Sequence, residues 1–112
     1  MKQLNLSDIE WRLECEPEDM QIEGNASAID EETDKATCDW IGAELESGNH
    51  WAWCRVIVRG SYKGLTAFDS LCGCSYKSRE DFTVPGGYYD DMRGEVLAQL
   101  QNQLEAVCAD CN

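Results

Sequence analysis

Basic side chains are scarce in this chain of 112 residues, and they are scarcest in its first half. Residues 1–50 contain three basic and fourteen acidic side chains, which leaves a net charge of −11. Residues 51–112 contain six basic and eight acidic side chains, which leaves −2. A negative field of this kind repels nucleic acids and anionic membranes and attracts basic protein surfaces. The charge distribution therefore argues against direct contact with nucleic acid or a membrane, and it predicts a basic partner.

Long apolar runs and catalytic motifs are also missing. No segment is apolar and long enough to span a bilayer, and the chain has no basic-then-apolar leader, so we expect a soluble, unsecreted protein in the cytoplasm of a host cell. The sequence contains no phosphate-binding glycine loop, no GxSxG or HExxH motif and no spaced histidine ligands. We therefore expect a protein that is not an enzyme and that needs no cofactor.

The remaining composition is that of a folded domain. Hydrophobic residues make up 43% of the chain, with four Trp and four Tyr, whereas disordered acidic segments are poor in aromatics. Hydrophobic periodicity predicts a strand at 9–15, a helix at 33–47, two strands at 51–59 and 65–72 joined by a turn at 60–64, and a helix at 89–107. The first strand should bury Ile9, Trp11, Leu13 and Cys15. The first helix should present Ala36, Trp40, Ile41 and Leu45 on one face and end at a left-handed stop at Gly48-Asn49. The last helix should carry a continuous apolar stripe, formed by Met92, Val96, Leu100, Leu104 and Val107.

This β-α-β-β-α order predicts one α+β domain over residues 1–112, in which two helices cover one face of a small, mainly antiparallel sheet. Residues 16–32 are expected to form a surface loop, with a short helical piece or an edge strand as alternatives. The segment 72–75 is expected to leave the sheet. Ser78 opens a capping-box pattern for one short helical turn, which Pro85 and the following glycines end.

Four short motifs resemble a group of small bacteriophage and prophage proteins of undescribed function, over about residues 40–105. They are His50-Trp51-Ala52-Trp53-Cys54, Leu71-Cys72-Gly73-Cys74-Ser75-Tyr76, Asp81-Phe82 and Gly87-Tyr88-Tyr89-Asp90-Asp91-Met92. The motifs are aromatic and structural, so the resemblance implies an origin and carries no catalytic residues. Small acidic phage proteins include many that bind and disable host enzymes or defence complexes, which is what the resemblance implies here.

The acidic segment is the principal candidate site. Carboxylates on a rigid scaffold can imitate a phosphate track and occupy the nucleic-acid groove of a basic protein. We therefore expect an inhibitor or modulator of a basic host protein or nucleoprotein complex, in the anti-CRISPR or anti-restriction style. The expected contact residues are Glu18, Asp19, Glu23, Asp30, Glu31, Glu32 and Asp34. A solvated surface that only keeps the protein soluble is the alternative, and a Ca²⁺ site at 30–34 lacks the spacing of an EF-hand loop.

The seven cysteines offer a second hypothesis. An odd number without a leader favours reduced thiols over a disulfide framework. Four of them could hold Zn²⁺ and clip the C-terminal tail to the sheet, which would make the protein a structural or assembly module: Cys72, Cys74, Cys108 and Cys111. The alternative is that these cysteines are ordinary small hydrophobic residues.

The segment that opens the second predicted strand carries the remaining candidates. His50 is the only histidine, and on an extended strand it would lie about 13 Å from Cys54, too far for a Cys–His nucleophile. Trp51, Trp53 and Ile57 are predicted on the outer face of the hairpin. Aromatic residues are enriched at binding hot spots, so they predict a secondary interface with a partner or a second copy of the chain. The alternative is that residues 16–32 cover this face.

Overall fold

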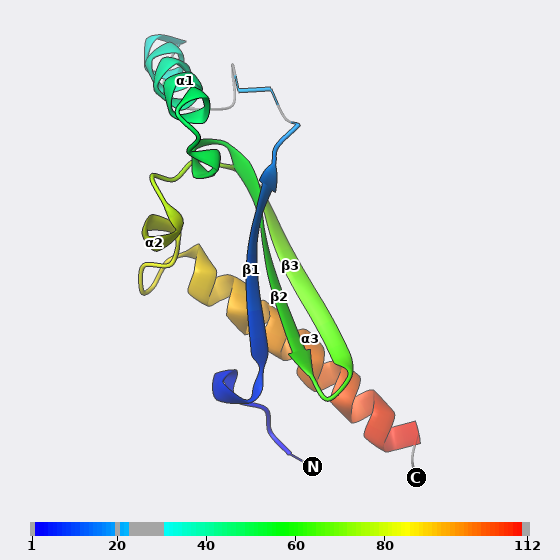
Figure 1. Ribbon diagram of the computed structural model, residues 1–112. Helices are drawn as coiled ribbons and strands as arrows, with labels where there is room; N and C mark the ends of the chain where they lie inside the picture. Colours follow the sequence, from blue (N-terminus) through cyan, green and yellow to red (C-terminus); the bar gives the residue numbers. More distant parts are fainter. Residues whose placement is uncertain (1, 20, 23–30, 111–112) are drawn as a thin grey trace. The chain divides into compact units, whose positions relative to one another are not determined.

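The computed structural model describes residues 2–19, 21–22 and 31–110, without the side chains of 31 and 108–110. Figure 1 shows the elements along the chain. In chain order they are η1 (Leu6–Asp8), β1 (Glu10–Pro17), α1 (Glu31–Glu46), η2 (His50–Ala52), β2 (Cys54–Tyr62), β3 (Leu65–Cys74), α2 (Arg79–Phe82) and α3 (Tyr88–Asp110). No helix in this described part of the chain is both long and apolar enough to cross a membrane.

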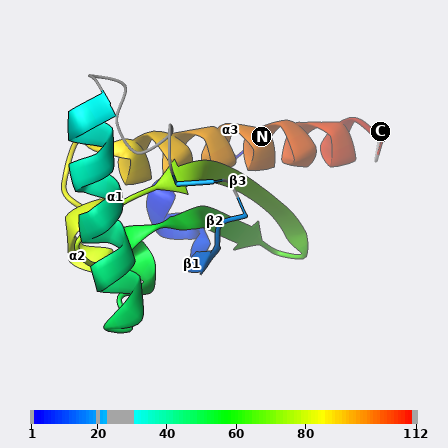
Figure 2. The same ribbon diagram turned by 90° about the horizontal axis from the view of Figure 1, so that it is seen from above.

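The three strands form one antiparallel sheet in the order β1-β2-β3, which confirms the predicted α+β class. β2 and β3 lie side by side as a hairpin (Figures 1 and 2). The hairpin closes tightly at Lys63 and Gly64, whose φ angles are 45° and 86°. Two consecutive positive φ angles are typical of the type I′ turn that matches strand twist. The turn is therefore shorter than the predicted 60–64, and β2 continues to Tyr62.

The start of β2 differs from the predicted strand. His50–Ala52 form a 3-10 turn, and β2 begins at Cys54 rather than at Trp51. The Asn49 side chain accepts a hydrogen bond from the Trp51 N–H at 3.2 Å, and the Tyr76 N–H donates to the Trp51 carbonyl at 2.7 Å. Because these bonds use the Trp51 backbone, its alternating sequence does not continue the strand.

The end of β3 also differs, since the segment 72–75 was expected to leave the sheet but β3 continues to Cys74. Gly73 has a φ of 64°, and its N–H donates to the Glu18 carboxylate at 2.9 Å. Along β3 the buried side chain is at an odd-numbered position at Ala67 but at an even-numbered position at Cys74. This shift in the alternation, together with a positive φ inside the strand, is typical of a β-bulge. The bulge turns the Cys74 side chain inward.

The described residues fall into two compact units. The first unit consists of the described residues within the ranges 1–14, 57–70 and 84–112. The second consists of the described residues within the ranges 15–56 and 71–83. In the first unit, α3 buries Met92, Val96 and Leu100, which are the start of the predicted apolar stripe. The stripe becomes exposed toward Val107, which is 47% exposed. The Gln103 side chain anchors this half of the helix by donating to the Thr66 carbonyl at 2.8 Å.

Replacing Gly60 with alanine should lower the free energy of unfolding by about 2 kcal/mol, because the added Cβ would overpack the first unit. It would lie 2.8 Å from Val96 Cγ1 and 2.9 Å from Ile9 Cγ2, and both are branches of stiff side chains. Chemical denaturation measures the loss. Gly42→Ala is the control, because a Cβ there meets nothing within 4 Å in a helix that favours alanine. A Gly60→Ala protein as stable as the parent would contradict the packing argument.

In the second unit, α1 packs Ile41 and Leu45 against Ala52 and Trp53. The helix ends in a Schellman arrangement. The Asn49 N–H donates to the Glu44 carbonyl at 2.9 Å, and the N–H of Gly48, with a φ of 97°, donates to the Leu45 carbonyl at 3.1 Å. This confirms the left-handed stop predicted after the helix, and it directs the chain from α1 straight into η2.

Candidate functional site

The exposed face of α1 is the most acidic regular surface described. The helix carries six carboxylates, and Lys35 is its single basic residue. Glu32, Asp39 and Glu46 are exposed and follow one another at intervals of seven residues, which is nearly two full turns. They therefore form a row along one side of the helix, with about 10 Å between successive positions. The exposed Lys35 lies on the same side, between Glu32 and Asp39.

Helix stability does not account for the charge at the C-terminal end of this row. The last turn of α1 contains Glu44 and Glu46 and no basic side chain. The carbonyl end of a helix is negative, so an exposed carboxylate there costs about 0.3–1 kcal/mol. The Ser47 hydroxyl has one proton, and the Glu44 main-chain carbonyl at 2.8 Å is a closer acceptor for it than the Glu44 carboxylate at 3.3 Å. Glu46 is therefore a carboxylate that does not stabilise its own helix.

An exposed tryptophan lies on α1 about 100° around the helix from the acidic row, and sequence reasoning did not predict its exposure. Trp40 is 39% exposed, whereas its neighbour Ile41 is fully buried. The helical pattern placed both residues on one apolar face, but only the Ile41 side meets the core. Tryptophan is among the residues most enriched at binding hot spots. The position of Trp40 next to Asp39 in the sequence was the one signal available.

The predicted contact residues are only partly brought together. Glu32 and Asp19 are exposed. Asp34 is half-buried and accepts a long hydrogen bond from the Cys38 thiol at 3.8 Å. Glu18 is half-buried and accepts from the backbone N–H of β3. The other three predicted residues, Glu23, Asp30 and the side chain of Glu31, lie outside the described part of the chain.

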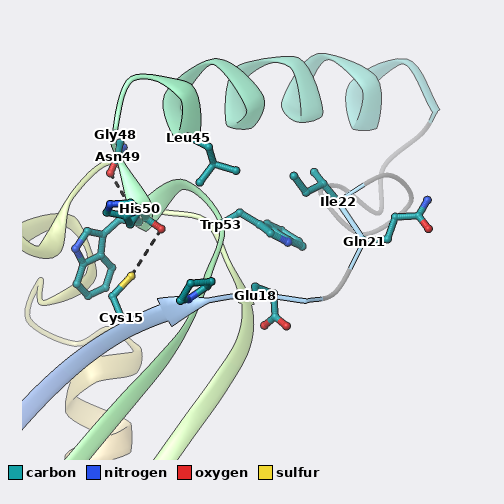
Figure 3. A pocket seen from close by; sticks show the side chains of 11 residues that line it. Cys15, Glu18, Gln21, Ile22, Leu45, Gly48, Asn49, His50 and Trp53 are labelled. Carbon is teal, nitrogen blue, oxygen red and sulfur yellow. Dashed lines mark hydrogen bonds between the residues drawn. The ribbon is translucent and has the colours of Figure 1, made fainter.

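The second unit also contains a pocket of about 790 Å³, shown in Figure 3. Its walls come from the end of β1 and the residues after it, the end of α1, η2 and Trp53. The lining residues are Cys15, Pro17, Glu18, Gln21, Ile22, Leu45, Gly48, Asn49, His50, Trp51 and Trp53. Pockets that bind ligands usually have about 300–1,000 Å³ and mostly apolar walls with a few polar groups. The sequence analysis did not predict this pocket, because its walls are distant in sequence.

The secondary interface predicted on the hairpin is wrong for two of its three residues. Trp53 is 5% exposed and Ile57 is 2% exposed, so both are core residues, while Trp51 is half-buried. Arg55 and Arg59 flank Ile57 on the same side of β2, and long Arg stems can cover apolar neighbours. Each guanidinium is held by a glutamate of β1, Arg55 by Glu16 at 2.8 Å and Arg59 by Glu14 at 3.2 Å.

Cys54 and Cys74 are buried in the second unit, and Cys15 is half-buried at the wall of the pocket. Burial raises the pKa of Cys15 and, more strongly, the pKa of Cys54. Burial likewise raises the pKa of Cys74 to about 11. The Cys15 thiol donates to the His50 carbonyl at 3.7 Å, and the Cys74 thiol donates to the Leu71 carbonyl at 3.2 Å. Protonated, hydrogen-bonded thiols of this kind are poor nucleophiles and poor metal ligands at neutral pH.

Of the four cysteines proposed to bind zinc, the structure describes the side chains of Cys72 and Cys74, and these two do not support the hypothesis. Cys72 is exposed and Cys74 is buried, so the two side chains of the proposed pair differ in accessibility. The Cys108 side chain and Cys111 lie outside the described residues. Within those residues, no group of three or more His, Cys, Asp or Glu side chains is arranged to hold a metal ion.

The free energy of unfolding should fall as the pH rises from 9 toward 11, and Cys74 should cause part of that fall. Its thiol has an ordinary pKa of 9.0 and a pKa of about 11 in the folded protein. Between these values the unfolded chain releases a proton that the folded chain keeps, so unfolding is favoured by about 1 kcal/mol per pH unit. Below pH 9 this contribution to stability is fully present.

Denaturation at pH values on either side of 9 tests this dependence. Cys74→Ala should make the loss of stability with pH less steep, whereas Cys72→Ala, which replaces an exposed thiol, should change it much less, because burial is the main cause of the raised pKa of Cys74. The same pH dependence in both variants would show that the Cys74 thiol does not contribute.

Comparison with known proteins adds no further assignment. The chain matches no protein-family model, no curated protein and no solved structure.

Proposed function

We propose that the protein is an acidic, phage-type binding protein that inhibits or modulates a basic host protein. The proposed target is a nucleic-acid-binding defence complex, whose Lys and Arg side chains would meet carboxylates where they normally meet phosphates. The observation that carries the proposal is the exposed surface of α1, on which Glu32, Asp39 and Glu46 form a row and Trp40 is exposed about 100° around the helix from it.

Two features favour binding over a purely solubilising surface. The charge is concentrated, since residues 1–50 hold all but two units of the net charge of −13. Solubility alone does not require that separation. In addition, Glu46 lies at the helix end where a carboxylate is unfavourable. Charge placed against the stability of its own helix is typical of a functional surface, where local rules are broken in exchange for binding.

A matched pair of triple variants tests the proposal. The first replaces the α1 row (Glu32→Lys, Asp39→Lys, Glu46→Lys), and the second makes the same change in charge elsewhere (Glu10→Lys, Glu95→Lys, Glu105→Lys). All six side chains are exposed, so both variants should fold. Each protein is immobilised and exposed to host-cell lysate at low and high salt, with and without competing DNA.

We expect the parent and the second variant to retain basic nucleic-acid-binding proteins at low salt and to release them on addition of salt or DNA. The α1 variant should retain none of them. Equal capture by the two variants would contradict the proposal. Thermal unfolding of all three proteins serves as the folding control, and Glu46→Lys by itself should not lower stability.

A further inference from the structure

The first unit contains a hollow of about 450 Å³ on the outer face of the sheet. A Cβ at Gly60 would meet Val96 of α3 at 2.8 Å, so the side chains on either side of Gly60 in β2 point away from α3. The hollow therefore opens on the face of the sheet that α3 does not cover, and we call it the sheet hollow. Two side chains from each strand surround it: Glu10 and Arg12, Arg59 and Ser61, and Thr66 and Phe68.

The two arginines of the sheet hollow share one carboxylate oxygen. Nε of Arg12 lies 3.3 Å and Nε of Arg59 lies 3.2 Å from Oε1 of Glu14. The Arg59 guanidinium is also held over the Phe68 ring, 5.5 Å from its centroid. Among the described residues neither guanidinium has a second acceptor. A guanidinium carries five N–H groups, so both arginines keep terminal donors for a ligand.

The carboxylate of Glu10 is the third charged group of the sheet hollow. Glu10 and Arg12 lie on the same face of β1, yet Arg12 pairs with Glu14. Glu10 is exposed, and no hydrogen bond or ion pair joins its carboxylate to another residue in the described part of the chain. The sheet hollow therefore offers a ligand one unpaired negative charge and, from two guanidinium groups that share Glu14, one net positive charge.

This charge pattern discriminates between classes of ligand. An anion would bind the guanidinium groups but would be repelled by Glu10, and a simple cation would bind Glu10 but would be repelled by the arginines. An apolar ligand would displace water from all three charged groups without replacing its hydrogen bonds. A ligand with one positive and one negative group satisfies both sides of the sheet hollow.

We infer that the sheet hollow binds a free α-amino acid as its zwitterion, with the carboxylate at Arg12 and Arg59 and the ammonium group at Glu10. Arginine binds carboxylates through paired N–H groups, and an ammonium group has three donors for a carboxylate. The hydroxyls of Ser61 and Thr66 can donate to the ligand or accept from it. The inference is independent of the proposed function, because none of the residues that line the sheet hollow belongs to α1.

Small probes that carry different charges test the site at neutral pH. L-alanine carries both charges, N-acetyl-alanine carries only the negative charge, and alaninamide carries only the positive charge. Binding is followed through the backbone amide resonances of Ser61 and Thr66 in ¹⁵N-labelled protein, with Ala43, an exposed residue of α1, as the reference. For L-alanine we expect a Kd of about 1 mM, and for each derivative binding about tenfold weaker, because one side of the sheet hollow is left without a partner.

Two variants that each remove one charge separate the two halves of the site. Glu10→Gln should weaken the binding of L-alanine about tenfold, because a charge-assisted hydrogen bond is lost, but it should not weaken the binding of N-acetyl-alanine. Arg59→Gln should weaken the binding of L-alanine by a similar factor without weakening that of alaninamide. The controls are Glu80→Gln and Lys35→Gln, whose exposed side chains do not line the sheet hollow and which should leave the binding of L-alanine unchanged.

The inference is supported if L-alanine shifts the amides of Ser61 and Thr66 but not that of Ala43, and if the two variants respond to the derivatives in opposite ways. It is overturned if L-alanine causes no shift, or if all probes bind equally well. Equal affinity of Glu10→Gln and Glu80→Gln for L-alanine would also overturn it, because the loss of a negative charge far from the sheet hollow would then have the same effect.

Discussion

Replacing Phe82 with alanine is expected to lower the free energy of unfolding by about 3–5 kcal/mol, the usual cost of truncating a fully buried phenylalanine. Phe82 is 1% exposed although it ends a helix of only four residues. The Tyr76 ring meets it nearly edge to face, with ring centroids 5.0 Å apart, and the Trp51 ring lies at 5.7 Å. Alanine would remove these contacts and leave a cavity. Chemical denaturation measures the loss directly.

Phe68→Ala is the matched control, since it removes the same side chain from a site that is 56% exposed. Its ring lies under the Arg59 guanidinium at 5.5 Å, an exposed contact worth about 0.5–1 kcal/mol. The loss for Phe82→Ala should therefore be several times larger. Because Phe82 packs on Trp51, the milder Phe82→Leu should also shift the indole resonance of Trp51 in the folded protein. Similar losses for Phe82→Ala and Phe68→Ala would contradict this account of the core.

The helices and strands were predictable because the spacing of apolar residues within each segment indicates its secondary structure without any knowledge of distant contacts. The alternation in residues 9–15 predicted β1, and the side chain of Leu13 at its centre is buried as expected. Gly48 marked the end of α1 because only a residue that tolerates a positive φ fits there. The α+β class then followed from the order of the elements.

The boundaries of the hairpin were not predictable, because they depend on partners distant in sequence. The alternating pattern at Trp51-Ala52-Trp53 fits a strand, but the backbone of Trp51 is bonded to Asn49 and Tyr76. Likewise, nothing near Gly73 in the sequence shows that the Glu18 carboxylate will accept its N–H and stabilise a bulge within β3. In both places a tertiary hydrogen bond decides the local structure.

The candidate site was predictable in its charge and not in its shape. Composition alone located the acidic half, and Glu32 is exposed on α1 as the binding hypothesis requires. The pocket could not be predicted, because Cys15, Leu45 and Trp53 meet there only through the fold. For the same reason Trp53 was assigned to a surface that it does not reach.

Replacing Trp40 with serine is expected to weaken binding to the basic partner about 30-fold or more, the effect of losing a hot-spot tryptophan. In the proposed complex, long-range charge would bring the partner to α1 and set the rate of encounter, but exposed ion pairs contribute little to the final affinity. Trp40 is the aromatic side chain of α1, it is 39% exposed, and in that complex it would provide an apolar contact at one edge of the acidic row. The loss should therefore appear mainly as faster dissociation, whereas reversal of the row should mainly slow association.

Surface plasmon resonance with a captured basic partner separates the two rates. Phe68→Ser is the control, since it removes another exposed aromatic ring from a different element, β3, and should leave both rates unchanged. Thermal unfolding of Trp40→Ser checks that the rest of α1, held through the buried Ile41, stays folded. If Trp40→Ser and Phe68→Ser dissociate at the parent's rate, the contact is purely electrostatic, and its affinity should then vanish at high salt. In the proposed complex, Trp40 would slow dissociation at low salt, while high salt would screen the ion pairs and release the partner.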